Sequence, residues 1–295
     1  MKILDLFSGI GGFSLGLERA GMQTIAFCEV DPVCRQVLKK HWPNVPIFED
    51  VKRLTAKDMY DTVDVIVGGF PCQDISLAGK GAGLAGERSG LWYEYHRLIK
   101  EIRPRYVIIE NVAALRSRGL DAVLWSLAEI GYDAEWHCIP ASAVGAPHQR
   151  DRVWILGYPN NYGSYGAKNR QSSASGNHRI TPRSKELVKF TRSSCEGPGD
   201  VLADTSSTRL SRGKRIRDYL EEALRRWSAT PRSTTERCPI SGRPTYSWHV
   251  EPAVGRVADG VPGRVDRLKQ LGNAVVPQIP ELIGRAILDY ENSLD

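Results

Sequence analysis

The first 157 residues alternate short apolar runs with segments of helical periodicity, and this alternation limits the possible folds more than any other feature. The β-rich runs predict strands at 3–7, 24–29, 45–48, 63–69 and 106–110. Helical patterns lie between them at 13–20, 32–41, 90–102 and 120–130. Strands separated by helices form a parallel sheet with helices on both faces. Two further extended runs, 134–140 and 152–158, have no helix between them and favour an antiparallel pair at the sheet edge.

Beyond Pro159 the character of the chain changes. Residues 160–200 are rich in Ser, Gly, Asn and basic residues, which is typical of long loops. The pattern at 214–227 predicts a helix that carries four arginines, and a last predicted helix at 278–291 has an apolar stripe that needs a core to pack on. The segment 158–250 holds 17 Lys and Arg against 8 Asp and Glu, although the whole chain has a net charge of only +6. Localised basic charge indicates nucleic-acid binding, with a solvated insertion as the alternative.

Composition places the chain among ordinary globular proteins. Of 295 residues, 41% are hydrophobic and 25% charged, so a sizeable core can form. No signal-peptide pattern opens the chain, and no run approaches the roughly 18 apolar residues of a membrane span. We therefore expect a cytoplasmic protein. The cysteines lack paired spacing and predict reduced thiols rather than disulfides or a metal site; they are Cys28, Cys34, Cys72, Cys138, Cys195 and Cys238.

One cysteine stands where chemistry is expected. The apolar run 64–70 stops at a Gly-Gly pair and then presents Pro71-Cys72-Gln73. Ligands of open α/β sheets bind just past the carboxyl ends of the strands, where a nucleophilic thiol could act. The alternative is that Cys72 is a small buried hydrophobe, as most free cysteines are.

The segment 5–12, Asp-Leu-Phe-Ser-Gly-Ile-Gly-Gly, links the first predicted strand to the first helix. Glycines there let the backbone approach a ligand closely, but the spacing differs from that of dinucleotide enzymes. Glu29 ends the second strand, where it could accept hydrogen bonds from a ribose, and Asp50 could reach an adenine amino group. Together they favour S-adenosylmethionine as cofactor. The alternative for Glu29 and Asp31 is capping of the helix that Asp31-Pro32 begins.

Charged residues mark two more predicted strand ends. Glu110 follows the apolar run 105–109, and a carboxylate leaving such a run is costly unless it is used or paired. It would emerge on the same sheet edge as Cys72. Arg150 and Arg152 alternate before the last predicted strand, so they are expected to point to one face and could hold an anion or a base carbonyl.

In this order, the segments resemble the DNA cytosine-5 methyltransferase family. The matching signatures are 5–12, 69–73 (Gly-Phe-Pro-Cys-Gln), 110–112 (Glu-Asn-Val), 150–152 (Arg-Asp-Arg) and 270–275 (Gln-Leu-Gly-Asn-Ala-Val). The resemblance spans residues 1–157 and 268–291, about 60% of the chain. The family commonly has glutamine where His148 stands, and its Thr-Leu hallmark is not evident in the basic segment.

The resemblance implies an α/β fold with a Rossmann-like S-adenosylmethionine-dependent methyltransferase domain and a small, loop-rich target-recognition domain. Residues 1–157 would be the catalytic and cofactor-binding domain, 158–265 the target-recognition domain, and 266–295 a C-terminal segment returning to the core. Cys72 would be the nucleophile and Glu110 the acid, with both arginines holding the base. The cofactor would lie against Phe7, Gly9, Gly11, Glu29, Asp50, Leu91 and Asn273, and DNA would contact Ser76 and Lys80.

The implied reaction moves a methyl group from S-adenosylmethionine to carbon 5 of a flipped-out cytosine in a specific duplex DNA sequence, through a covalent Cys72 adduct, and leaves S-adenosylhomocysteine. No metal is expected. The resemblance also implies a monomer with a possible cognate restriction endonuclease, in a prokaryotic or phage-infected cell. Two alternatives stay open: the same chemistry on tRNA, and a DNA-binding module without catalysis.

Overall fold

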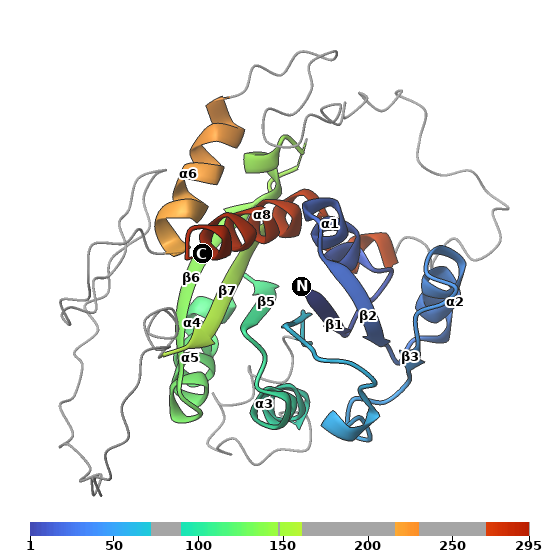
Figure 1. Cartoon of the computed structure of the whole chain (residues 1–295). Helices are drawn as coiled ribbons and strands as arrows, with labels where there is room; N and C mark the ends of the chain where they lie inside the picture. Colours follow the sequence, from blue (N-terminus) through green and yellow to red (C-terminus); the bar gives the residue numbers. More distant parts are fainter. Residues whose placement is uncertain (72–89, 147, 161–215, 230–269, 295) are drawn as a thin grey trace, which may run out of the picture.

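A seven-stranded sheet forms the centre of the molecule in the computed structural model, which describes residues 1–71, 90–146, 148–160, 216–229 and 270–294 (Figure 1). The strand order is β3-β2-β1-β4-β5-β7-β6. The strands are β1 (Lys2–Leu6), β2 (Gln23–Cys28), β3 (Ile47–Phe48), β4 (Val65–Gly68), β5 (Tyr106–Val112), β6 (Tyr132–Pro140) and β7 (Asp151–Pro159). Strands β1 to β5 run parallel, β7 is antiparallel to β5, and β6 is antiparallel to β7.

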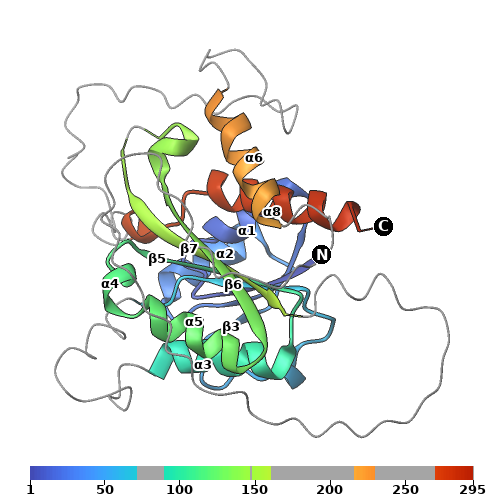
Figure 2. The same cartoon turned by 90° about the vertical axis from the view of Figure 1, so that its left-hand side faces the viewer.

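Helices cover both faces of this sheet, as the view in Figure 2 shows. One face packs against α3 (Gly90–Ile102), the short α4 (Leu115–Arg118) and α5 (Leu120–Glu129). The other packs against α1 (Gly12–Ala20), α6 (Ile216–Ala229) and α8 (Gln278–Asn292). The helix α2 (Pro32–His41) links β2 to β3, and the 3-10 turns η1 (Ala56–Asp58) and η4 (Ala141–Val144) lie in connections. The fold is therefore a doubly wound, Rossmann-like α/β sheet.

The C-terminal helix α8 packs directly on α1 and completes one helix layer. Its apolar stripe is buried, with Ile283 3% and Ile287 0% exposed. The two helices approach so closely that a Cβ at Gly16 would lie 2.2 Å from the carbonyl oxygen of Pro277. Likewise, a Cβ at Gly284 would lie 2.9 Å from the Cβ of Ala20. The apolar stripe thus packs where the sequence predicted, against the N-terminal core.

The helix α6 lies inside the predicted target-recognition segment, yet it packs on the core. Ile216 and Leu220 are buried in the same hydrophobic cluster as α1 and α8. The ring of Tyr219 meets that of Tyr290 on α8 edge to face, with 6.0 Å between the ring centroids. This packing attaches α6 to the helix layer formed by α1 and α8.

Most predicted elements are confirmed within one or two residues, including α2 at the predicted bounds and the antiparallel pair β6 and β7. Strand β3 is shorter than predicted, and β5 is longer, so Glu110 lies inside β5 rather than at its end. Among the described residues, no helix is long and apolar enough to cross a membrane. Cys28, Cys34 and Cys138 form no disulfide, and the other three cysteines lie outside the described residues.

Candidate functional site

The carboxyl ends of β1 and β4 meet at the point where the strand order reverses. Crossovers leave β1 and β4 in opposite directions along the sheet, so a crevice opens there in doubly wound folds. The Gly-rich loop follows β1, and Gly69-Phe70-Pro71 follows β4 and leads to Cys72. The predicted nucleophile Cys72 and the predicted DNA contacts Ser76 and Lys80 lie outside the described residues.

The Gly-rich loop turns sharply before α1. Phe7, Gly9 and Gly11 all have positive φ, of 53°, 53° and 85°. The amide of Gly11 donates to the carbonyl of Ser8 at 2.8 Å, which closes the turn. A Cβ at Gly9 would meet no atom within 4 Å, so the loop borders open space at this point. The Phe7 ring stacks on that of Tyr95 with 6.3 Å between the centroids.

Glu29 joins this loop to the turn after β2. Its Oε2 accepts a hydrogen bond of 2.7 Å from the amide of Gly9, and its Oε1 accepts one of 2.8 Å from the amide of Asp31. Asp31 is the helix cap, because its carboxylate accepts from the amide of Val33 at 2.8 Å. Asp31 therefore caps α2, as the alternative expected, whereas the Glu29 carboxylate binds the Gly-rich loop through the amide of Gly9. Each Glu29 oxygen keeps a lone pair for a ligand hydroxyl.

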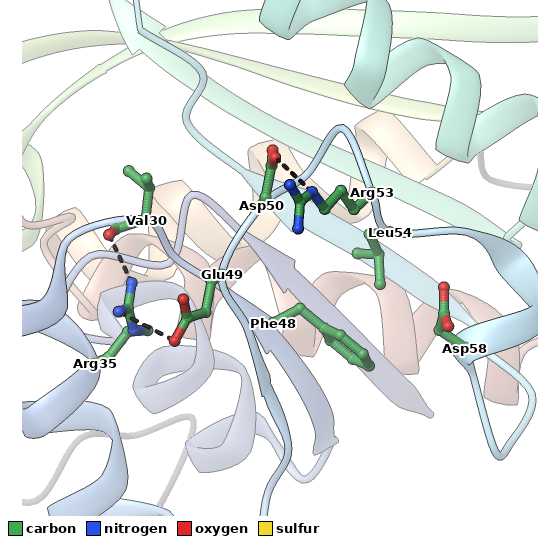
Figure 3. A pocket seen from close by; sticks show the side chains of 8 residues that line it. All are labelled: Val30, Arg35, Phe48, Glu49, Asp50, Arg53, Leu54 and Asp58. Atoms are coloured by element: carbon green, nitrogen blue, oxygen red, sulfur yellow. Dashed lines mark hydrogen bonds and ion pairs between the residues drawn. The ribbon is translucent and has the colours of Figure 1, made fainter.

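Asp50 lines a pocket of about 620 Å³ beside Glu29. Apolar side chains and charged groups share its wall, as Figure 3 shows; the lining residues are Val30, Arg35, Phe48, Glu49, Asp50, Arg53, Leu54 and Asp58. The amide of Lys52 donates to Asp50 Oδ1 at 2.9 Å, and Arg53 Nε lies 3.8 Å from Oδ2. A flat, partly apolar ring with a donor edge suits such a pocket.

Leu91 and Asn273 are the two remaining predicted cofactor residues. Leu91, in the first turn of α3, is partly buried against the hydrophobic cluster that Phe7 also contacts. Asn273 is exposed. Its segment is close to the Gly-rich loop, because a Cβ at Gly12 would lie 2.6 Å from the carbonyl oxygen of Val275. The structure thus brings Phe7, Gly9, Gly11 and Glu29 together after β1 and β2, while the cofactor roles of Asp50, Leu91 and Asn273 stay predictions.

Glu110 and Arg152 form an ion pair where β5 and β7 run side by side. Arg152 Nε lies 3.0 Å from Glu110 Oε1, and the Glu110 side chain is 13% exposed. Burial raises the pKa of Glu110 above its ordinary value, although the charges of Arg152 and Arg150 and the hydrogen bond from Arg152 oppose the rise. Glu110 Oε2 lies against Gly69, where a Cβ would approach it to 3.0 Å. The carboxyl group is thereby held beside the strand end that leads to Cys72.

The Arg150 guanidinium binds different partners from the Arg152 guanidinium. Its Nη1 donates to the carbonyl of Gly272 at 2.6 Å, and its Nη2 donates to that of Ala274 at 2.8 Å. The expectation that both arginines point to one face assumed an extended backbone. Arg150 instead precedes β7 and has a positive φ of 42°. It links the site to the residues on either side of Asn273, while its charge still acts on Glu110.

Asn111 is a site residue that sequence reasoning missed. It is 3% exposed, and its Nδ2 donates to the carbonyl of Phe70 at 3.0 Å. This bond ties β5 to the residue two positions before Cys72. An amide in an apolar strand, directly after a carboxylate, was the available signal, since a buried polar group must find a partner. Among the described residues, no group of His, Cys, Asp and Glu could hold a metal ion.

Comparison with known proteins supplies the family. The model of the C-5 cytosine-specific DNA methylase family matches residues 1–245. The chain belongs to this family. One relative is the Type II methyltransferase M2.BsuMI of Bacillus subtilis, 38% identical over 164 residues that cover 53% of this chain and 41% of the relative. Another is M.CviJI of Paramecium bursaria Chlorella virus IL3A, 36% identical over 163 residues that cover 55% and 44%.

The chain therefore spans less than half the length of either relative. A solved structure matches over its whole length: a protein described as a DNA modification methyltransferase encoded within a prophage (E. coli) covers 99% of both chains. Its TM-score is 0.55 and its sequence identity is 18%, so the likeness concerns the fold alone.

Proposed function

We propose that the chain transfers a methyl group from S-adenosylmethionine to carbon 5 of a flipped-out cytosine in a specific duplex DNA sequence. Glu110 carries the proposal. It is a buried carboxyl group with a raised pKa, it is paired with Arg152, and it lies against the end of β4 that continues to Cys72. Family membership supports the same reaction.

The described residues suit an adenosine-containing cofactor. The pocket beside Glu29 has room for an adenine ring, with Val30, Phe48 and Leu54 as its apolar wall and Asp50 as an acceptor for the ring amino group. The open space over Gly9 leaves room for the rest of the molecule. When bound there, S-adenosylmethionine supplies an electrophilic methyl group. The residues that would hold it are Phe7, Gly9, Gly11, Glu29, Asp50, Leu91 and Asn273.

Carbon 5 of cytosine is too weak a nucleophile to take the methyl group directly. Attack of the Cys72 thiolate on carbon 6 forms a sulfur–carbon bond and moves the ring electrons toward N3, which makes carbon 5 an enamine carbon. Glu110 donates a proton or hydrogen bond to N3 as negative charge develops there, because its raised pKa favours the protonated form. After methylation, a base removes the carbon-5 proton, and the carbon–sulfur bond breaks to release Cys72.

The arginines orient the groups that react. Arg152 holds Glu110 through Oε1, which leaves Oε2 over Gly69 to face the base. Arg150 positions the carbonyls of Gly272 and Ala274 and thus the segment that carries Asn273. The cytosine must leave the duplex because carbon 6 is not reachable inside the stack. Ser76 and Lys80 are proposed to contact the DNA backbone.

The domain division is proposed on the same grounds. Residues 1–157 form the catalytic half, and the packing of α8 on α1 supports the return of 266–295 to it. The basic segment 158–265 would recognise the target sequence, attached to the core through α6. The Type II names of the relatives support a restriction-modification setting. A monomeric state, a cognate endonuclease and a cytoplasmic location stay predictions.

The reaction is tested with labelled S-adenosylmethionine and DNA, and with DNA bearing 5-fluorocytosine as a covalent trap. The wild type should label cytosine and form an adduct that survives denaturation, whereas Cys72→Ala should do neither. Cys138→Ala is the matched control, since Cys138 is an exposed thiol on β6, and it should still form the adduct. Absence of label on DNA of varied sequence would refute the proposal. Label on tRNA in preference to DNA would show that tRNA is the substrate of the same reaction.

A further inference from the structure

Arg35 is a charged residue in the pocket wall whose role the signatures do not explain. It lies in α2, one turn after the cap residue Asp31, and its side chain is only 21% exposed. Its Nη1 donates to two backbone carbonyls, that of Val30 at 2.6 Å and that of Glu29 at 3.2 Å. Its Nη2 lies 3.2 Å from Glu49 Oε1. One guanidinium therefore contacts the turn after β2 and the segment after β3 at once.

These two segments are the opposite walls of the pocket that Figure 3 shows. The turn after β2 carries Glu29 and Val30, and the segment after β3 carries Glu49 and Asp50. The pairing of β2 with the two-residue strand β3 joins the two segments at their base. In Figure 3 the Arg35 side chain stands between Val30 and Glu49, joined to both by dashed lines. The Arg35 side chain is therefore a second link between the walls, beside the bond of 2.9 Å from the amide of Glu29 to the carbonyl of Phe48.

A guanidinium is suited to this task because its donors form a rigid, planar fork. Two carbonyl oxygens and a carboxylate can be bound in fixed directions, which the compact ammonium of lysine cannot reproduce. The Glu49 side chain is 73% exposed, so its ion pair alone contributes little. The bonds to the carbonyls of Glu29 and Val30 are the more important contacts, since they set the turn that presents Glu29 to Gly9.

We propose that Arg35 is a positioning residue for the adenosine part of the cofactor. It holds the Glu29–Val30 turn against the Glu49–Asp50 segment at the separation that an adenine ring requires. The inference rests on the proposed function, because it names what organises the same cofactor pocket. Arg35 is part of the pocket wall and does not take part in methyl transfer.

The test measures binding of S-adenosylhomocysteine by calorimetry, which needs no catalysis. Arg35→Ala should raise its Kd about tenfold, because two charge-assisted hydrogen bonds to the wall are lost. Arg35→Lys should recover only part of the affinity, and Glu49→Gln should raise Kd by about twofold. The control is Lys39→Ala, which removes an exposed positive charge from the same helix and should leave Kd unchanged.

Two further readouts separate positioning from general stabilisation of the fold. In Arg35→Ala the KM for S-adenosylmethionine should rise while kcat at saturating cofactor stays within about twofold. Millimolar guanidinium ion should restore binding to Arg35→Ala and have no effect on the wild type. Wild-type affinity in Arg35→Ala, or a loss of affinity that guanidinium does not reverse and that lowers kcat equally, would overturn the inference. If the wild type itself bound no S-adenosylhomocysteine, the proposed function would fail instead.

Discussion

Asp5 should make the stability of this protein depend on pH in an unusual direction. The side chain is fully buried at the end of β1. Its Oδ2 accepts hydrogen bonds from the Ser14 hydroxyl at 2.7 Å and the Ser14 amide at 3.3 Å, whereas Oδ1 has no partner in the part of the chain that the structure describes. Burial raises the pKa of Asp5 to about 7; the bonds from Ser14 oppose the rise, and the charges of Glu29 and Glu18 add to it.

The size of the effect follows from the two pKa values. The unfolded chain loses this proton near the ordinary value of 3.8, but the folded chain keeps it to about pH 7. Between those values the folded state binds more protons than the unfolded state, so the free energy of unfolding decreases as pH rises. Three pH units at about 1.4 kcal/mol each give a loss of up to about 4 kcal/mol by pH 7. Below pH 4 the contribution of the neutral carboxyl is fully present.

Asp5→Asn removes the ionisation and keeps the shape. Urea unfolding at pH 5, 6, 7 and 8 should show that the variant gains stability over the wild type as pH rises. Asp58→Asn is the control. Hydrogen bonds from Thr55 lower the pKa of Asp58, so the contribution of the Asp58 carboxylate to stability is lost only as the pH falls into the acid range. A difference between Asp5→Asn and the wild type that stays constant from pH 5 to pH 8 would refute the reasoning.

Two further substitutions test the packing and the site. Gly16→Ala places a Cβ 2.2 Å from the backbone oxygen of Pro277, so α1 and α8 must separate; we expect a loss of about 3 kcal/mol in chemical unfolding. Gly90→Ala, where a Cβ meets nothing within 4 Å, should leave stability nearly unchanged. Asn111→Ala removes the bond to the Phe70 carbonyl and should lower the single-turnover rate at least tenfold, with cofactor Kd unchanged. An unchanged rate in Asn111→Ala would show that β5 does not position the end of β4.

The regular elements of the core could be predicted because their patterns are local. Parallel strands are buried on both faces and so read as continuous apolar runs, as the prediction of 63–69 for β4 illustrates. The start of α2 was readable because Asp31-Pro32 is a strong cap signal, and the structure has both residues in those roles. The sheet edge was also predicted as an antiparallel pair, although the position of β7 between β5 and β6 was not.

The partners of charged residues were harder to predict because they come from distant segments. Arg150 and Arg152 are two positions apart, yet one binds the carbonyls of Gly272 and Ala274 and the other binds Glu110. The positive φ of Arg150 redirects its side chain, and the local sequence does not predict this φ. Packing of α6 on α8 was missed for a similar reason. The sequence showed its four arginines, whereas the burial of its apolar residues depends on the surface that the helix meets.

The sequence by itself determined the doubly wound class, the chain order of the elements and the identity of the residues that end the strands. These follow from hydrophobic periodicity and turn chemistry, which act over a few residues. Tertiary structure alone decided how those residues meet: the pairing of Glu110 with Arg152, the bond from Glu29 to Gly9, and the guanidinium of Arg35 between the pocket walls. Such contacts depend on the sheet bringing strand ends within hydrogen-bond range, and burial then raises the pKa of Asp5 and of Glu110.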